Sequence, residues 1–193
     1  MAHILLIDNY DSFTYNLYHQ LEKISDSEIT VVRNDEMDIN TVGQYDVIVL
    51  SPGPKLPKDA GCMMDIIHQY HSHKPIIGIC LGMQGLAEYF GSTLQNLNIP
   101  EHGQSKKMNV LQMQPLFENC PDVFNVGRYH SWGIKKNNLG KMLVPASIDE
   151  DNWVMSFIHQ AYKIIGIQFH PESILTEYGD MVMQNALKYC GVK

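Results

Sequence analysis

The stretch "PIIGICLGMQGLAEYFG", residues 75–91, decides the fold class of this chain. It opens with a short apolar run, 75–79, which is typical of a strand buried on both faces. A helical spacing of apolar side chains follows. Cys80 stands at the corner between the two patterns, with Gly78 and Gly82 two residues to either side. A strand that passes directly into a helix predicts an α/β sheet, and the bracketed thiol points to chemistry at the corner.

The sequence on both sides of this stretch extends the same alternation. Short apolar runs predict strands, and helical spacing predicts helices, over residues 3–8, 12–24, 28–34, 45–54, 60–73, 74–80 and 82–91 in turn. From about residue 93 the pattern changes to strand-like pieces separated by turn residues, at 93–97, 107–117, 124–132, 152–160 and 162–173, before a closing helix at 176–190. We therefore expect an open, mostly parallel sheet with helices on both faces. A smaller antiparallel β portion is expected in the C-terminal half, within one domain that covers residues 1–193.

The composition excludes several classes of function. The chain has 193 residues, a net charge of −7 and 45% hydrophobic residues, so nucleic acid is not an expected partner and no basic membrane-binding face is expected. No apolar run approaches the roughly 20 residues that span a bilayer, and the N-terminus has no signal-peptide pattern. The four cysteines form no CxxC pair. We expect reduced thiols and a cytoplasmic location.

Four polar or glycine-rich segments follow predicted strands. They are "DNYDSF" (8–13), "SPGPKLP" (51–57), Cys80 and "FHPES" (169–173). Ligand sites of open α/β sheets form at the carboxyl ends of the strands, so we expect these segments to meet. In the first of them, the polar side chains either form part of a partner surface at the cleft rim or cap the following helix; they are Asp8, Asn9, Asp11 and Ser12.

The sequence "GICLG" (78–82) has the form of a nucleophile elbow. Such a turn projects the Cys80 sulfur into the cleft, and the N–H of Leu81 and the helix N-terminus point at the same space and favour the thiolate. A buried structural cysteine is the alternative. The glycine bracket favours the nucleophile for Cys80, whereas the other cysteines lack it and are interpreted as structural; these are Cys62, Cys120 and Cys190.

A thiolate nucleophile requires a base and a residue that orients the base. His170 ends an apolar strand pattern, and Glu172 lies two residues further on. Alternate residues of an extended segment point the same way, so Glu172 is placed to hold the imidazole. A solvated surface turn is the alternative. The remaining histidines are weaker candidates: His130 has no nearby acid, and the group His68, His71 and His73 fits a solvated helix end better than a metal site.

These residues, and five motifs that include them, resemble one family over essentially the whole chain. The motifs occur in family order: "DNYDSFTYNL" (8–17), "SPGP" (51–54), "GICLGMQ" (78–84), "RYHS" (128–131) and "FHPESILT" (169–176). The chain resembles the class I, or triad, glutamine amidotransferases, whose fold is flavodoxin-like. Within them it is most similar to the small subunits of anthranilate synthase and aminodeoxychorismate synthase, rather than to the GMP synthetase or carbamoyl-phosphate relatives.

The resemblance implies a mechanism. Cys80 would attack the side-chain amide of L-glutamine, His170 would carry the proton and Glu172 would orient His170. The backbone N–H groups of Leu81 and Gly53 would form the oxyanion hole.

The resemblance also implies residues that bind glutamine, namely Gly53, Lys55, Gln84, Ser131 and Trp132. The ammonia would pass to a large, chorismate-binding subunit. That subunit is expected to carry Mg²⁺, while no metal or cofactor is expected in this chain. The tryptophan branch, through anthranilate synthase, is favoured over the folate branch or a subunit shared by both. Two less favoured hypotheses are a stand-alone cysteine hydrolase and a non-catalytic binding subunit.

The chain departs from the family pattern at three positions. Lys55 stands where a glycine is usual, which a backbone contact tolerates at negative φ but which is costly at positive φ. Met83 replaces a histidine that is not the base, so we expect only a change in packing. Gln104 replaces a lysine, which affects a loop or partner contact rather than the chemistry.

Overall fold

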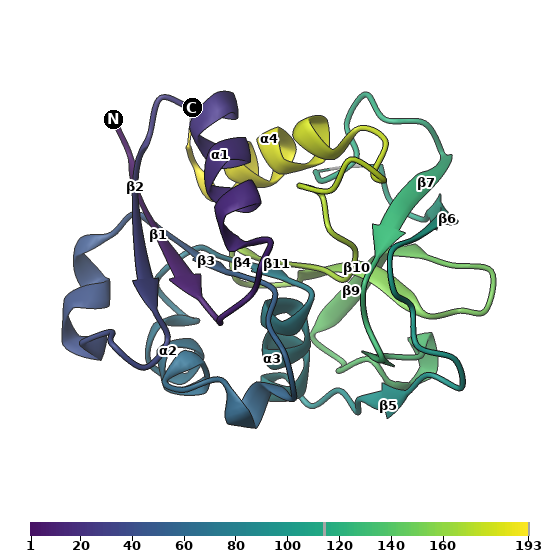
Figure 1. The fold of residues 1–193 in the computed structure, drawn as a ribbon, viewed down its shortest axis with the longest axis horizontal. Helices are drawn as coiled ribbons and strands as arrows, with labels where there is room; N and C mark the ends of the chain where they lie inside the picture. The colour runs from purple at the N-terminus through teal and green to yellow at the C-terminus, as the bar shows by residue number, and fades with distance from the viewer. Residues whose placement is uncertain (114, 193) are drawn as a thin grey trace.

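The computed structural model describes residues 1–113 and 115–192 and has one large mixed sheet at its centre (Figure 1). Five strands run parallel in the order β2-β1-β3-β4-β11: Glu28–Arg33, His3–Asp8, Val47–Leu50, Ile76–Ile79 and Ile164–Ile167. Four antiparallel strands continue the same sheet in the order β10-β9-β6-β7: Val154–His159, Leu143–Ile148, Gln104–Val110 and Val123–Arg128. A separate two-stranded sheet joins β5 (Gln95–Asn96) to β8 (Trp132–Gly133). The predicted fold class is confirmed.

Helices cover both faces of the parallel strands (Figure 1). Helices α1 (Thr14–Ile24) and α4 (Gly179–Cys190) pack side by side in one hydrophobic core. Helices α2 (Met63–Tyr70) and α3 (Leu81–Tyr89) pack together in the other. The described residues also form three short 3₁₀ helices, η1 (Ile39–Gln44), η2 (Pro57–Asp59) and η3 (Lys136–Asn138). The fully apolar runs β3, β4 and β11 are buried along their whole length, as strands covered on both faces must be.

Several boundaries differ from the sequence predictions. Helix α1 begins at Thr14 after the N-cap residue Phe13, so Ser12 does not cap it. Strand β9 was not predicted, because Pro145 interrupts its apolar pattern; its pairing with β10 contains an irregularity in register, where the ladder tolerates a proline. The predicted segment 107–117 includes Gln114, and the predicted domain ends at Lys193; both residues lie outside the described part of the chain.

The glycines that flank Cys80 allow helix α3 to lie directly against the sheet. A Cβ atom on Gly82 would lie 2.5 Å from the carbonyl oxygen of Leu50 in β3. A Cβ atom on Gly78 would lie 2.5 Å from the carbonyl carbon of Gly82 itself. Both separations are far shorter than van der Waals contact. Glycine at these two positions is therefore a packing requirement for the strand-to-helix corner.

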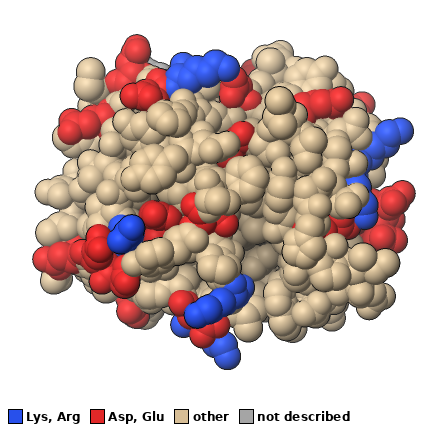
Figure 2. All heavy atoms as spheres, in the orientation of Figure 1, with Lys and Arg blue, Asp and Glu red and all other residues tan. Residues whose placement is uncertain are grey.

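Other features of the described residues bear on the predictions made from composition. None of their helices combines the length and apolar character needed to cross a bilayer. All four cysteines are free thiols. The face shown in Figure 2 carries more acidic than basic side chains and no continuous basic patch.

A pair of glycine substitutions tests the packing requirement. Gly82→Ala should lower the free energy of unfolding by about 2–3 kcal/mol, because the added methyl group meets backbone that cannot move away. Gly91→Ala is the control: its φ of +84° disfavours alanine, yet the new methyl group would meet no atom within 4 Å, so a loss of about 1 kcal/mol is expected. Urea denaturation of both variants measures the difference. Equal losses would contradict the close-packing argument.

Candidate active site

Cys80 occupies a strained turn between β4 and α3. Its backbone has φ 50° and ψ −100°, a conformation that costs roughly 1–3 kcal/mol for a residue with a side chain. The turn is held from both sides: the Cys80 N–H donates to the carbonyl of Ile167 at 2.7 Å, and the N–H of Gln84 donates to the Cys80 carbonyl at 3.0 Å. The residue is 5% exposed. The corner thus fixes the sulfur at the carboxyl edge of the parallel strands, as the elbow motif predicts.

His170 and Glu172 form a buried hydrogen-bonded pair. The distance from His170 Nδ1 to Glu172 Oε1 is 2.7 Å, and both side chains are almost completely buried. The predicted reason for the pairing is wrong, because the segment is not extended. Residues 170–173 form a turn in which the N–H of Ser173 and the hydroxyl of Thr176 donate to the His170 carbonyl, at 3.2 and 2.6 Å.

The imidazole of His170 lies between aromatic rings and next to the thiol. The ring centroids of Phe13 and Tyr129 are 5.0 and 4.8 Å from that of His170. Burial disfavours the imidazolium, but the neighbouring Cys80 sulfur and Glu172 carboxylate outweigh burial and raise the pKa of His170 to about 10. Nε2, the nitrogen not used by Glu172, is buried and has no hydrogen-bond partner among the described residues. His170 is therefore suited to remain an imidazolium next to the Cys80 side chain.

Gln168 is a site residue that the sequence analysis missed. Its Nε2 donates to the Cys80 sulfur at 3.6 Å, and its Oε1 accepts from Gln84 Nε2 at 3.1 Å. Gln84 also donates to the Trp132 carbonyl at 2.9 Å and is 3% exposed. The predicted glutamine contact Gln84 thus connects α3, β8 and the thiol. The only sequence signal for Gln168 is an amide placed directly after the apolar run of β11.

The segment "DNYDSF" (8–13) supports the loop that follows β3. The N–H of Asn9 donates to Ser51 Oγ and its side-chain amide donates to the Ser51 carbonyl, both at 2.9 Å. A Cβ atom on Gly53 would lie 2.6 Å from Asn9 Cβ and from Leu81 Cδ2, so glycine is required where the loop passes Leu81. The structure therefore brings Gly53 and Leu81, the two predicted oxyanion donors, into contact.

The acidic residues of the same segment do not cap α1, which has no side-chain cap hydrogen bond; they bond within the turn before it instead. Asp8 Oδ1 accepts from the N–H of Tyr10 at 2.9 Å and from the Thr14 hydroxyl at 2.8 Å. Asp11 Oδ1 accepts from the N–H of Phe13 at 2.8 Å. These bonds fix the turn that leads into α1 and carries Phe13 to His170.

The remaining predicted glutamine contacts are divided between two segments. Ser131 and Trp132 lie at the start of the small sheet, where the Ser131 carbonyl accepts from the N–H of Leu97 at 2.8 Å. Lys55 is exposed and follows the Gly53 loop with φ 67°. This is the costly geometry considered for a lysine at this position, since positive φ favours glycine.

The other two positions that depart from the family pattern, and the remaining histidines, lie outside the group of polar side chains around Cys80 and His170. Met83 is fully buried in the α2–α3 core, and Gln104 is exposed at the start of β6. Burial, with the charges of Arg128 and His170, lowers the pKa of His130 to about 3, so this imidazole is neutral near pH 7. His71 Nδ1 lies 3.1 and 3.0 Å from helix carbonyls, as expected at a helix end. Within residues 1–113 and 115–192, no three His, Cys, Asp or Glu side chains are grouped to hold a metal ion.

The strained lysine gives a stability prediction. Lys55→Gly should raise the free energy of unfolding by about 0.5–1 kcal/mol, because it removes the Cβ penalty at positive φ. Lys58→Gly removes the same charge three residues away, in η2, and should lower stability through glycine's greater entropy when unfolded. Thermal or urea denaturation compares the two variants. A loss of stability in Lys55→Gly would contradict the conclusion that the backbone of Lys55 is strained.

Comparisons with known proteins bear on the family of this chain. The family model described as "Glutamine amidotransferase class-I" matches residues 5–190. A Pseudomonas aeruginosa protein named "Anthranilate synthase component 2, pyocyanine specific" is 38% identical over 97% of this chain and 94% of its own length. A Vibrio parahaemolyticus "Anthranilate synthase component 2" is 38% identical over 98% and 96%.

A solved structure from Thermoplasma acidophilum, described provisionally as one subunit of a GMP synthase, superposes with a TM-score of 0.88 at 28% identity. The match covers 99% of this chain and 94% of that one. The family model and the two anthranilate synthase relatives extend over nearly the whole chain. The chain therefore belongs to the class I glutamine amidotransferase family.

Proposed function

We propose that this chain is a glutaminase subunit that hydrolyses L-glutamine through a Cys80 thioester and supplies ammonia to a chorismate-using synthase, specifically anthranilate synthase. The observation that carries the proposal is the buried arrangement of Cys80, His170 and Glu172 at the carboxyl edge of the sheet. The names of the relatives, which are second components of anthranilate synthase, support the choice of acceptor.

In the first half-reaction the Cys80 thiolate attacks the side-chain amide carbon of glutamine. The new carbon–sulfur bond forms as the carbonyl electron pair moves to oxygen. The His170 imidazolium then donates its proton to the amide nitrogen, the carbon–nitrogen bond breaks and ammonia leaves, so that a γ-glutamyl thioester remains. In the second half-reaction His170 takes a proton from water, hydroxide attacks the thioester, and glutamate leaves as the Cys80 thiolate is released.

The oxyanion of both tetrahedral intermediates requires hydrogen-bond donors. The N–H of Leu81, at the start of α3, and the N–H of Gly53 in the neighbouring loop are the proposed donors. Around the rest of the substrate we assign Lys55, Gln84, Ser131 and Trp132 to glutamine binding.

The proposed acceptor of the ammonia is a separate, chorismate-binding subunit that carries the Mg²⁺. The matched relatives are named as one component of a synthase, which supports a separate subunit for the chorismate chemistry. We treat residues 1–193 as the glutaminase domain of that assembly.

The experiment that tests the function combines the purified chain with candidate large subunits, chorismate, Mg²⁺ and glutamine, and identifies products by mass spectrometry. Glutamine-dependent anthranilate with one large subunit is the expected result. Formation of aminodeoxychorismate would instead assign the folate branch. Hydrolysis of glutamine or γ-glutamyl peptides that no large subunit stimulates would indicate a stand-alone hydrolase.

Replacement of the nucleophile should distinguish synthesis that uses glutamine as the source of ammonia from synthesis that uses added ammonium salts. Cys80→Ser should abolish glutamine-dependent synthesis by at least about 10³-fold, because a serine hydroxyl is a far weaker nucleophile here, while synthesis from added ammonium salts remains. The control is Cys62→Ser, a half-buried thiol at the start of α2, which should leave both activities unchanged. Full glutamine-dependent activity in Cys80→Ser would exclude the thioester mechanism.

The pH dependence of kcat/KM for glutamine tests the His170–Glu172 pair. A pKa of about 10 for His170 keeps the proton donor charged at neutral pH, and activity should fall as the pH rises toward that value. Glu172→Gln removes one of the two groups that raise this pKa, so the alkaline limb should move to lower pH. Glu177→Gln changes an exposed carboxylate that binds Asn125 instead and should leave the limb in place. An unmoved limb in Glu172→Gln would contradict the assignment.

A further inference from the structure

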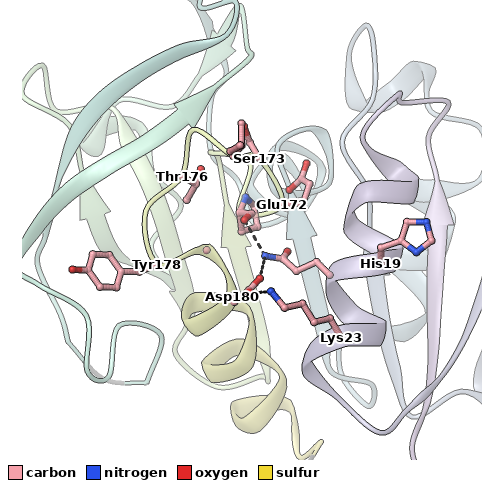
Figure 3. Close-up of a pocket in the computed structure, with 11 residues that line it drawn as sticks. His19, Lys23, Glu172, Ser173, Thr176, Tyr178 and Asp180 are labelled. Carbon is pink, nitrogen blue, oxygen red and sulfur yellow. Dashed lines mark hydrogen bonds and ion pairs between the residues drawn. The ribbon is translucent and has the colours of Figure 1, made fainter.

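The carbonyl group of Pro171, between His170 and Glu172, is held from two sides by residues outside the triad. From helix α1, Gln20 Nε2 donates to the Pro171 oxygen at 2.9 Å. From the first turn of α4, Gly179 lies so close that a Cβ atom on it would be 2.0 Å from the same oxygen. Figure 3 shows part of this junction, where a dashed line joins Lys23 to Asp180. From Asp180 the hydrogen bonds continue to Gln20 and from Gln20 to the Pro171 oxygen.

The Gln20 amide is itself fixed in one orientation. Its Nε2 also donates to Asp180 Oδ1 at 3.0 Å, so the NH₂ group faces two acceptors and the side chain is 7% exposed. Lys23 Nζ lies 2.7 Å from Asp180 Oδ2. Burial disfavours the ionised carboxyl of Asp180, but Lys23 and Gln20 outweigh burial and lower its pKa, so it remains an acceptor near pH 7.

The rest of the turn leaves this carbonyl to Gln20. The hydrogen bonds made within the turn, from Ser173 and Thr176, go to the carbonyl of His170. Proline has no N–H with which to anchor its own peptide unit. The outer side of the turn borders a cavity of about 570 Å³, lined by Gln20, Pro171, Glu172, Gly179 and Asp180 among others.

We propose that Gln20 and Gly179 are positioning residues of the triad: together they fix the Pro171 carbonyl and thereby the 2.7 Å contact between His170 and Glu172. The proposal rests on the glutaminase function proposed above. Among the described residues, the hydrogen bonds of Gln20 go to Pro171 and Asp180, and the close contact of Gly179 is with Pro171, not with the thiol or the predicted glutamine contacts. Their loss should therefore alter the chemical step rather than substrate binding.

The first test is Gln20→Met, which keeps the length of the side chain and removes the donor. Glutamine-dependent kcat should fall about 10–100-fold, the range typical when an orienting hydrogen bond or about 1 Å of alignment is lost. KM for glutamine should change by less than about twofold, because the contacts that bind glutamine equally in the ground state and the transition state are unaffected. The alkaline limb of kcat/KM should move to lower pH, as in Glu172→Gln, since a loosened Glu172 supports the imidazolium less well.

The second test is Gly179→Ala, which should displace the same carbonyl sterically. The φ of Gly179 lies outside the left-handed region, and alanine favours helix, so the backbone itself accepts the change. The methyl group must push the Pro171 oxygen away. The same fall in kcat and the same shift of the alkaline limb are expected.

The control is Glu22→Gln, an exposed carboxylate on α1 that contacts only Tyr18 and His19 in the hydrogen bonds described for it. It should leave kcat, KM and the pH profile unchanged. Synthesis from added ammonium salts, which depends on the large subunit, should be normal in all three variants. If Gln20→Met and Gly179→Ala lower only the melting temperature, with kcat and the pH profile per folded molecule unchanged, the positioning role is overturned. Failure of the glutaminase function itself would appear differently, as full glutamine-dependent activity in Cys80→Ser.

Discussion

The close approach of helix α3 to the sheet is the constraint on which the rest of the site depends. Gly78 and Gly82 leave no space for a side chain between the end of β4, the start of α3 and the backbone of β3. The chain must therefore turn within one residue, and Cys80 takes the strained conformation that results. The strain is tolerated because β11 and α3 hold the backbone of Cys80 by hydrogen bonds on both sides. The thiol thus gains its position from packing, before any catalytic partner is considered.

The catalytic partners are placed by a different kind of interaction. A buried imidazolium and a buried carboxylate are each costly, and the cost is offset only when they lie against each other in good geometry. The pair His170–Glu172 meets that condition, and the neighbouring Cys80 sulfur also favours the charged imidazole. Because Glu172 Oε2 has no hydrogen-bond partner among the described residues, the contact through Oε1 carries most of the compensation. A small rotation of either side chain would therefore change the charge state of the base as well as its direction.

The sequence was most informative where local pattern and tertiary structure agree. Buried parallel strands are continuous apolar runs, so β1, β3, β4 and β11 could be located from the sequence, and the elbow followed from its glycines. Strand β9 was missed because Pro145 breaks the pattern and the irregular register beside it is visible only in the pairing. Gln168 and Asn9 were missed as supporting residues for a similar reason. The hydrogen-bond partners of these two amides lie on segments that are distant in sequence. A sequence alone does not distinguish such a buried, bonded amide from one that is exposed on the surface.

The two halves of the site differ in how firmly they are held. The Cys80 corner belongs to a strand and a helix whose neighbours are almost entirely buried, so its position is as stable as the core. The His170 turn belongs to an irregular segment that carries the fully exposed side chain of Ile174 and borders a cavity. Local stability follows buried contacts and protected hydrogen bonds, so the turn is the less secure half. An amide donor from α1 and a glycine contact from α4 meet the middle of this turn. Added constraint has the greatest effect there, because these contacts join the turn to two helices that pack in the core.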